Sequence, residues 1–239
     1  MSSFTSLPRG PLVAWPNTCA ICAGASRGSA GRVCAACLER WAPLRSRCRR
    51  CALPLPGDAG ICGACVKEPP PLAGALAAAD YGHPWDGLLQ DFKFHAALDL
   101  APALAALLQR TWHAAGSPPA DALLPVPLGA ARLRERGYNQ AAVIAQRLAA
   151  LVGRPWHRHA LRRGFDAAPQ SSRRRAERLQ ALRGAFVVEP AAAERLRGRH
   201  LVLVDDVMTT GATVHEAART LLQAGAASVQ AWVVARTPP

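Results

Sequence analysis

The chain has 239 residues, half of them hydrophobic, and its 29 Lys and Arg against 16 Asp and Glu give a formal charge of +13. This length allows one or two domains with a real core. No apolar run approaches the ~18–20 residues of a membrane span, and the N-terminus lacks the charged and apolar regions of a secretory signal, so we expect a cytoplasmic protein. The basic charge suits phosphate-rich partners, although a preference for Arg over Lys explains part of it.

The cysteines all lie near the amino end, in four C-x-x-C pairs: Cys19/Cys22, Cys34/Cys37, Cys48/Cys51 and Cys62/Cys65. Each pair puts two thiolates on one tight turn, and two such turns complete a tetrahedral Zn²⁺ site. In a cytoplasmic chain, metal binding is favoured over a disulfide framework. The pattern therefore predicts two closed, structural zinc sites in a module over residues 1–68.

The spacing leaves the pairing of these cysteine turns open. Sequential pairing puts Cys19, Cys22, Cys34 and Cys37 in one site and the other four in the second, and spacing does not exclude a crossed arrangement. The module also carries a run of closely spaced arginines, Arg45, Arg47, Arg49 and Arg50. These either form a solvated face or help the module to contact nucleic acid or another partner.

Prolines at residues 69–71 end this module and predict a stiff spacer before a second domain over residues 72–239. We expect a strand over residues 72–81 and amphipathic helices over Trp85–Phe94 and residues 101–112. Lys93 falls in the last turn of the first helix. There it either complements the helix dipole or contacts a substrate.

A second basic region follows a predicted strand over residues 122–126. The region spans residues 131–140, and a helix is expected over residues 141–152, ended by Gly153. Arg132, Arg134 and Arg136 are thereby placed in a loop between a strand end and a helix. Their guanidinium groups either clamp a pyrophosphate or face solvent.

The most basic stretch spans residues 162–183, where Gly164, Asp166 and Pro169 argue against one continuous helix. It forms either a solvated, arginine-rich helix or a mobile cover that excludes water from an active site. Further strands of the sheet are expected at residues 186–188 and 229–234.

Residues 201–213, LVLVDDVMTTGAT, are the most informative stretch. The apolar run predicts a buried strand of a parallel sheet, with Asp205 and Asp206 at its carboxyl end, where open α/β sheets bind ligands. Thr213 and Glu216 form a T-x-x-E capping box, so a loop over residues 208–212 should lead into a helix N-terminus, which favours an anion. Two carboxylates beside a phosphate cradle fit a sugar phosphate.

The segment VLVDDVMTTGAT resembles the phosphoribosyl-pyrophosphate (PRPP) signature of type I phosphoribosyltransferases at nearly every position. The resemblance implies that Asp205 and Asp206 are the catalytic pair and hold the ribose 2′- and 3′-hydroxyls, with the 5′-phosphate on residues 209–213. It also implies Mg²⁺ chelated mainly by PRPP. The PRPP-binding residues implied here are Val207, Met208, Thr209, Thr210, Gly211, Ala212 and Thr213.

The segment LLPVPLGAARLRERGYNQA resembles a block of the ComF family, competence-associated proteins with a phosphoribosyltransferase domain. The order of cysteine turns, F-K-F, this block and VDDVMTTGAT also matches, over nearly the whole chain. The implied fold is α/β, a type I phosphoribosyltransferase-like parallel sheet with flanking helices, preceded by a double zinc-ribbon module. The resemblance adds four residues to the PRPP-binding set: Arg136, Tyr138, Asn139 and Gln140.

The chain departs from the family pattern in its most basic stretch. The pattern there has Thr, Leu and Asn at the positions of Ala167, Arg173 and Ala181, whereas Gln170, Arg178 and the G-A-F of residues 184–186 agree. If this stretch is the active-site cover, these departures bear on catalytic competence.

The resemblance implies a PRPP-binding protein that transfers a phosphoribosyl group to an unidentified acceptor and is linked to DNA uptake. The oxocarbenium-like transition state of such a transfer needs positioning and charge stabilisation more than a strong base. The alternative is a non-catalytic, zinc-containing, single-stranded-DNA-binding protein that keeps the fold as a phosphate site, although few aromatic residues are available for base stacking. A gene-regulatory PRPP sensor fits less specifically, because no DNA-reading helix stands out.

Overall fold

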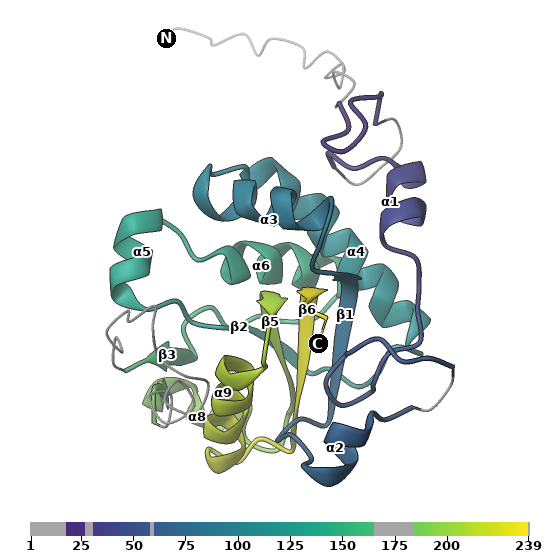
Figure 1. Cartoon of the computed structure of the whole chain (residues 1–239). Helices are drawn as coiled ribbons and strands as arrows, with labels where there is room; N and C mark the ends of the chain where they lie inside the picture. Colours follow the sequence, from purple (N-terminus) through teal and green to yellow (C-terminus); the bar gives the residue numbers. More distant parts are fainter. Residues whose placement is uncertain (1–17, 27–30, 58–59, 165–183, 239) are drawn as a thin grey trace, which may run out of the picture.

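The centre of the molecule is a four-stranded sheet in the order β1-β6-β5-β2. The computed structural model describes residues 18–26, 31–57, 60–164 and 184–238 (Figure 1). The strands of this sheet are β1 (Gly74–Asp80), β2 (Ala122–Pro125), β5 (His200–Met208) and β6 (Ser228–Arg236). Their pairings are parallel, so their carboxyl ends meet at one edge of the sheet.

Helices cover both faces of the sheet, which makes a three-layer α/β fold (Figure 1). Along β5, Val202 and Val204 pack with the helices of one face, whereas Leu201 and Leu203 pack with those of the other. This alternation follows from the two-residue period of a strand. The first face carries α3 (Trp85–Phe94), the 3₁₀ turn η1 (Leu98–Leu100), α4 (Ala101–Ala114) and α6 (Gln140–Val152), and the second carries α8 (Pro190–Leu196) and α9 (Ala212–Gln223).

Two expectations about the sheet and its loops are wrong. The basic segment after β2 is not a loop, because α5 (Ala130–Arg136) occupies it and ends at Gly137, whose φ of 77° is left-handed. The strand β4 (Phe186–Val188) does not join the main sheet but pairs antiparallel with β3 (Leu161–Arg163). Phe186 is buried beside α9. A short apolar segment that is buried in this way has the composition of a strand even when it lies outside the main sheet.

The basic stretch that was interpreted as a cover or a solvated helix lies largely outside the described residues. This holds for residues 165–183, among them Ala167, Gln170, Arg173, Arg178 and Ala181. Within the described parts of the chain, the helices are too short or too polar to cross a bilayer.

The cysteine module contains two short helices, α1 (Ala35–Trp41) and α2 (Gly63–Lys67), and straddles the edge strand β1 (Figure 1). Its first half packs on the face that carries α3 and α4, where the Trp85 indole donates to the Trp41 carbonyl at 2.7 Å. Its second half packs toward the other face through Ala52, and the Arg49 carbonyl accepts from the Ala75 amide at 2.8 Å. Both halves therefore rest directly on the sheet domain.

Candidate functional site

Asp205 and Asp206 lie near the carboxyl end of β5, as the sequence predicted. Each carboxylate turns back onto the following peptide: Asp205 Oδ1 accepts from the Asp206 amide at 2.9 Å, and Asp206 Oδ1 accepts from the Val207 amide at 2.7 Å. Asp206 is only 3% exposed. The two side chains are therefore held by the strand itself, with their second oxygens left for other contacts.

Lys93 of α3 supplies a charge to this carboxylate pair. Its Nζ lies 3.0 Å from Asp206 Oδ2, and the two side chains are 19% and 5% exposed. Burial raises the pKa of Asp205 well above its ordinary value, and the neighbouring Asp206 charge raises it further, while Lys93 opposes both effects. Lys93 is thus part of the site rather than only a residue that complements a helix dipole.

The loop after β5 turns sharply into α9. Thr209 and Thr210 are exposed, and Gly211 is the N-cap residue with a left-handed φ of 82°. A Cβ on Gly211 would also stand 2.8 Å from His215 Nε2, so both conformation and space require glycine here. Burial, with Arg219 and Arg236 nearby, lowers the pKa of His215 to about 4, so a neutral ring backs this turn.

The predicted capping box between Thr213 and Glu216 is wrong, because the helix begins one residue before Thr213 and Gly211 occupies the cap. Glu216 instead accepts from the Gly184 amide at 2.8 Å and pairs with Arg219 at 3.0 Å. The N-terminus of α9 still favours an anion, since the first-turn amides of a helix lack carbonyl partners within the helix.

A cavity of about 560 Å³ opens at the carboxyl end of the sheet. It brings together predicted site residues from two regions of the sequence: Asp205, Asp206, Val207, Thr213, Arg136, Asn139 and Gln140. Lys93, Arg132 and Arg163 line it as well. Cationic groups and the carboxylate pair therefore share one open space next to the amino end of α9.

Some predicted residues stand behind the cavity rather than along it. Tyr138 donates its hydroxyl to the Phe92 carbonyl, and burial raises its pKa. The Met208 side chain is 2% exposed, within the core. The remaining members of the predicted loop adjoin the cavity without being among its lining residues: Thr209, Thr210, Gly211 and Ala212.

Asn139 lines the cavity and also has a structural task. Its Oδ1 accepts from the amides of Ala141 and Ala142, which caps α6, and its Nδ2 donates to the Val126 carbonyl at 3.0 Å. It therefore fixes the start of α6 to the end of β2, and this positions the neighbouring Gln140 at the cavity wall.

Gln90 and Phe94 are among the cavity residues that sequence reasoning missed. Both lie on α3 within one turn of Lys93, and the Arg136 guanidinium stacks over the Phe94 ring at 4.8 Å. The signal that could have found Gln90 is its helical spacing from Lys93, since residues three apart share a helix face.

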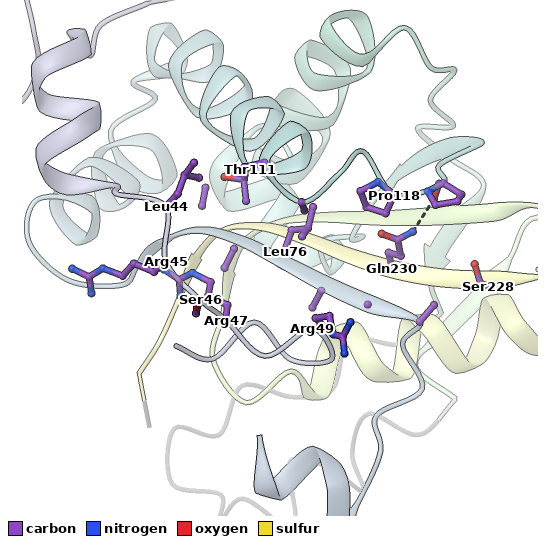
Figure 2. A pocket seen from close by; sticks show the side chains of 18 of the residues that line it. Leu44, Arg45, Ser46, Arg47, Arg49, Leu76, Thr111, Pro118, Ser228 and Gln230 are labelled. Atoms are coloured by element: carbon purple, nitrogen blue, oxygen red, sulfur yellow. Dashed lines mark hydrogen bonds between the residues drawn. The ribbon is translucent and has the colours of Figure 1, made fainter. Parts of the chain in front are cut away.

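A larger cavity, of about 720 Å³, lies elsewhere, along β1 and the amino ends of β5 and β6 (Figure 2). Small β1 side chains, segment 43–49 and the end of α4 surround it, and its described lining contains no carboxylate. Two of its arginines are engaged with the end of β1: Arg45 and Arg47 pair with Asp80 at 3.0 and 2.7 Å. Size alone is therefore a poor guide to the site in this molecule.

The eight cysteines form two clusters in the sequential pairing, Cys19, Cys22, Cys34 and Cys37, and Cys48, Cys51, Cys62 and Cys65. Within each cluster the sulfur atoms lie within 4.8 Å of one another. The Cys22–Cys34 and Cys51–Cys62 sulfurs are 3.8 and 3.6 Å apart. A tetrahedron with Zn–S bonds of about 2.3 Å has edges of about 3.8 Å, so both clusters fit zinc.

Backbone amides prepare the first cysteine of each cluster as a thiolate. Burial alone would raise the pKa of Cys19, but amides of Cys22, Cys34 and Ile21 outweigh it and bring the pKa to about 6. Amides of Cys62, Arg50 and Cys51 likewise outweigh burial at Cys48, whose pKa is about 7. Since the thiolate is the metal ligand, this environment favours metal binding.

Comparison with protein families gives two matches. Residues 12–66 match the double zinc ribbon domain, and residues 133–238 match the phosphoribosyl transferase domain. Together with the geometry above, the first match identifies the two cysteine clusters as the zinc sites of a double ribbon. The second agrees with the parallel α/β fold.

Curated relatives align over most of the chain. The DNA utilization protein YhgH of Salmonella typhi is 34% identical over 226 residues, which cover 93% of this chain and 98% of that protein. Competence protein F of Haemophilus influenzae is 31% identical over 225 residues, covering 91% of this chain and 96% of that protein. Competence protein ComFC of Bacillus subtilis is 34% identical over 150 residues, covering 62% and 58%.

Proposed function

The chain belongs to the ComF family, and from that premise we propose that it binds PRPP at the carboxyl end of its sheet and transfers the phosphoribosyl group to an acceptor. One observation carries the proposal. The Asp205–Asp206 pair, the arginine-lined wall and the amino end of α9 surround a single cavity of about 560 Å³. Carboxylates suit ribose hydroxyls, whereas guanidinium groups and helix-end amides suit phosphates.

In this proposal Asp205 and Asp206 accept hydrogen bonds from the ribose 2′- and 3′-hydroxyls. Asp206 already pairs with Lys93 at 3.0 Å, so an arriving hydroxyl competes with the ammonium for the same carboxylate. Lys93 is then displaced toward the phosphates or shares the carboxylate with the sugar. The negative charge of the pair also favours the positive charge that develops on the ribose as the C1–O bond breaks.

The two phosphate ends of PRPP have separate supports. The 5′-phosphate is bound by residues 209–213, at the exposed turn before α9. The pyrophosphate lies toward Arg132 and Arg136, which belong to α5 and line the same cavity. Mg²⁺ bound with the pyrophosphate would neutralise part of its charge, and the carboxylates that line the cavity, Asp205 and Asp206 among them, suit such an oxygen-ligated cation. The residues of the chain thus bind and orient the leaving group.

We further propose that the chain is organised as a zinc-ribbon module over residues 1–68 and a transferase-like domain over residues 72–239. The closed four-thiolate sites leave no ligand position for a substrate, so their zinc is structural. This role agrees with the contacts that both ribbon halves make with the sheet domain, through the first core cluster for one half and through Ala52 for the other.

The names of the relatives connect the family with DNA utilization and competence. A second candidate function is therefore binding of single-stranded DNA without catalysis, favoured by the net charge of +13. The arginines of segment 45–50 support it less than the sequence suggested, because Arg45 and Arg47 pair with Asp80 and Arg50 donates to the Leu72 carbonyl. A salt-dependent affinity for oligonucleotides, together with no release of pyrophosphate, is the result expected for this candidate.

Calorimetric titration of the zinc-loaded protein with Mg-PRPP tests the proposal. We expect binding by the wild type and its loss in the Asp205→Asn/Asp206→Asn variant, whose side chains are near-isosteric but uncharged. A screen of acceptors for pyrophosphate release then tests transfer. If the folded, zinc-replete wild type does not bind Mg-PRPP, the proposal is wrong.

A further inference from the structure

Arg236 joins the second zinc ribbon to the turn that precedes α9. It is the last residue of β6, lies beside Met208 in the sheet register and is only 6% exposed. Its Nε donates to the Cys51 carbonyl at 3.0 Å. Its Nη1 faces the carbonyls of Met208 and Thr237, at 3.0 and 2.8 Å, and the carbonyl of Thr209. One buried guanidinium thus contacts a zinc-site residue and residues 208–211, here called the phosphate loop, which lead into the proposed 5′-phosphate site at residues 209–213.

These contacts orient the loop. In a trans peptide the C=O and N–H groups point in opposite directions. Because the Met208 and Thr209 carbonyls point to Arg236, the amides of Thr209 and Thr210 point away from it. Thr209 and Thr210 are also the exposed residues of the turn. The buried guanidinium therefore holds two amide donors on the side from which an anion can approach.

The other end of the contact depends on zinc. The Cys51 carbonyl belongs to the turn of residues 48–52. Ala52 ends this turn with a left-handed φ of 57°, and its amide donates to the Cys48 carbonyl at 2.8 Å. Cys48 and Cys51 are both ligands of the second cluster. A zinc ion that joins their sulfurs to those of Cys62 and Cys65 fixes this turn, and with it the carbonyl that anchors Arg236.

The first zinc ribbon offers a matched comparison. There an arginine also bridges the ribbon to the domain, since Arg110 of α4 donates to the Ala42 carbonyl. That contact leads to α4 and not to the phosphate loop. The two arginines therefore differ in what they reach, although each binds a ribbon carbonyl.

Resting on the proposed function, we propose that Arg236 is a positioning residue through which zinc in the second ribbon maintains the phosphate-binding form of residues 208–211. Arg236 does not touch the ligand; it holds the carbonyl side of the loop whose amide side binds the 5′-phosphate. Loss of zinc from the second ribbon then weakens phosphate binding, whereas loss from the first ribbon does not.

The test is calorimetry on the full chain with two probes, ribose 5-phosphate for the loop and pyrophosphate for the arginine wall. Hydrogen bonds to charged groups suggest that Arg236→Met and Cys62→Ser weaken ribose 5-phosphate binding by about tenfold or more, and pyrophosphate binding by less than about threefold. Arg236→Lys, which keeps the charge but not the fork, should fall between wild type and Arg236→Met. Arg110→Met and Cys22→Ser are the controls and should leave ribose 5-phosphate binding within about threefold of wild type, because the first ribbon contacts α3 and α4 and not residues 208–211.

Amide hydrogen exchange without any ligand separates this inference from the proposed function. The Ala212 amide donates to Thr210 Oγ1 and the Thr237 amide donates to the Met208 carbonyl, so both report the order of the loop. Faster exchange of these two amides in Arg236→Met and Cys62→Ser, but not in the two controls, supports the coupling even if the wild type binds neither probe. Unchanged exchange in Arg236→Met, or equal acceleration by Cys22→Ser, overturns it. Ribose 5-phosphate binding that survives in a folded Arg236→Met variant overturns it as well.

Discussion

The two halves of the cysteine module share one local design but rest on different parts of the molecule. In each half an alanine follows the first C-x-x-C pair, Ala23 or Ala52, with a φ of 57°, and its amide donates to the carbonyl of Cys19 or Cys48. The first half leans on α3 and α4 through packing and the Trp85 indole. The second is bonded to the end of β1 and, through Arg236, to the loop after β5.

The difference teaches that a repeated metal-binding pattern does not assign equal roles to its copies. Zinc and the knuckle turns give each half its own stability. Whether zinc in one half affects the structure of the candidate site depends on which residues of the sheet domain that half contacts.

Removing zinc from both sites is expected to lower the stability of the protein most, because it removes the metal that holds each half together. Structural zinc sites contribute on the order of 10 kcal/mol each, and so small a module lacks a sufficient core without metal. We expect two zinc ions per chain by metal analysis, and a large loss of melting temperature by circular dichroism after chelation. Cys22→Ser and Cys62→Ser should each retain one ion. A melting curve unchanged by complete chelation would contradict a structural role.

Lys93→Met perturbs the candidate site without touching either zinc ribbon. The substitution leaves Asp206, with a side chain 5% exposed, without its 3.0 Å partner. Breaking such a buried pair costs about 3 kcal/mol of unfolding free energy, measurable by urea denaturation. The Lys93→Met/Asp206→Asn double variant should recover most of this loss, because it removes the uncompensated charge. If the double variant instead loses as much unfolding free energy as the two single variants together, Lys93 and Asp206 are not coupled.

The partly buried His215, next to Gly211 in the phosphate loop, makes the unfolding free energy of the protein depend on pH. Its folded pKa of about 4 lies below the ordinary 6.5, so the unfolded chain binds the proton more readily. Stability is then complete above about pH 6.5 and falls as the pH drops toward about 4, by up to about 3 kcal/mol.

His215→Gln removes this titration and should flatten the pH dependence of the unfolding free energy between about pH 6.5 and 4. Thermal or urea denaturation at several pH values measures it. An identical slope in the variant and the wild type would assign the pH dependence to other groups.

A matched pair of arginine variants measures the smaller, direct anchors of the two halves. Arg47 pairs with Asp80 at 2.7 Å with side chains 11% and 28% exposed, whereas Arg32 pairs with Asp99 at 3.0 Å with side chains 40% and 56% exposed. Exposed ion pairs contribute about 0.5 kcal/mol, and largely buried ones more. We expect Arg47→Met to cost about 2 kcal/mol and Arg32→Met less than about 0.5 kcal/mol in urea denaturation. Equal losses would remove this difference between the halves.

The sequence predicted the elements that depend on local pattern. The strand with Asp205 and Asp206, the helix Trp85–Phe94 and the presence of two four-cysteine sites follow from periodicity and spacing, whereas the sequential pairing of the cysteine turns came only from the structure. It could not place β4, because a short buried strand reads alike in the main sheet and in a separate pair. It placed the cap of α9 at Thr213 and not at Gly211, because neither the left-handed φ of Gly211 nor the His215 ring that would meet a Cβ there can be read from local spacing.

Long-range contacts were beyond the sequence for a related reason. Nothing in the spacing of Lys93 and Asp206 indicates that they meet, and Arg236 follows Cys51 by 185 positions in the chain. Such contacts arise from the order of the strands, which brings β6 between β1 and β5. The arginines near Cys48 were likewise open to several interpretations until Asp80 was placed beside Arg47.

The most direct test is one titration series with Mg-PRPP on the wild type, Cys22→Ser and Cys62→Ser, each with its remaining zinc site loaded. We expect the wild type to bind Mg-PRPP, Cys22→Ser to bind it within about threefold of the wild type, and Cys62→Ser to bind it at least about tenfold more weakly. Equal affinities in the two variants would contradict the coupling of the second ribbon to the phosphate loop. Absence of binding in all three would contradict the PRPP site itself.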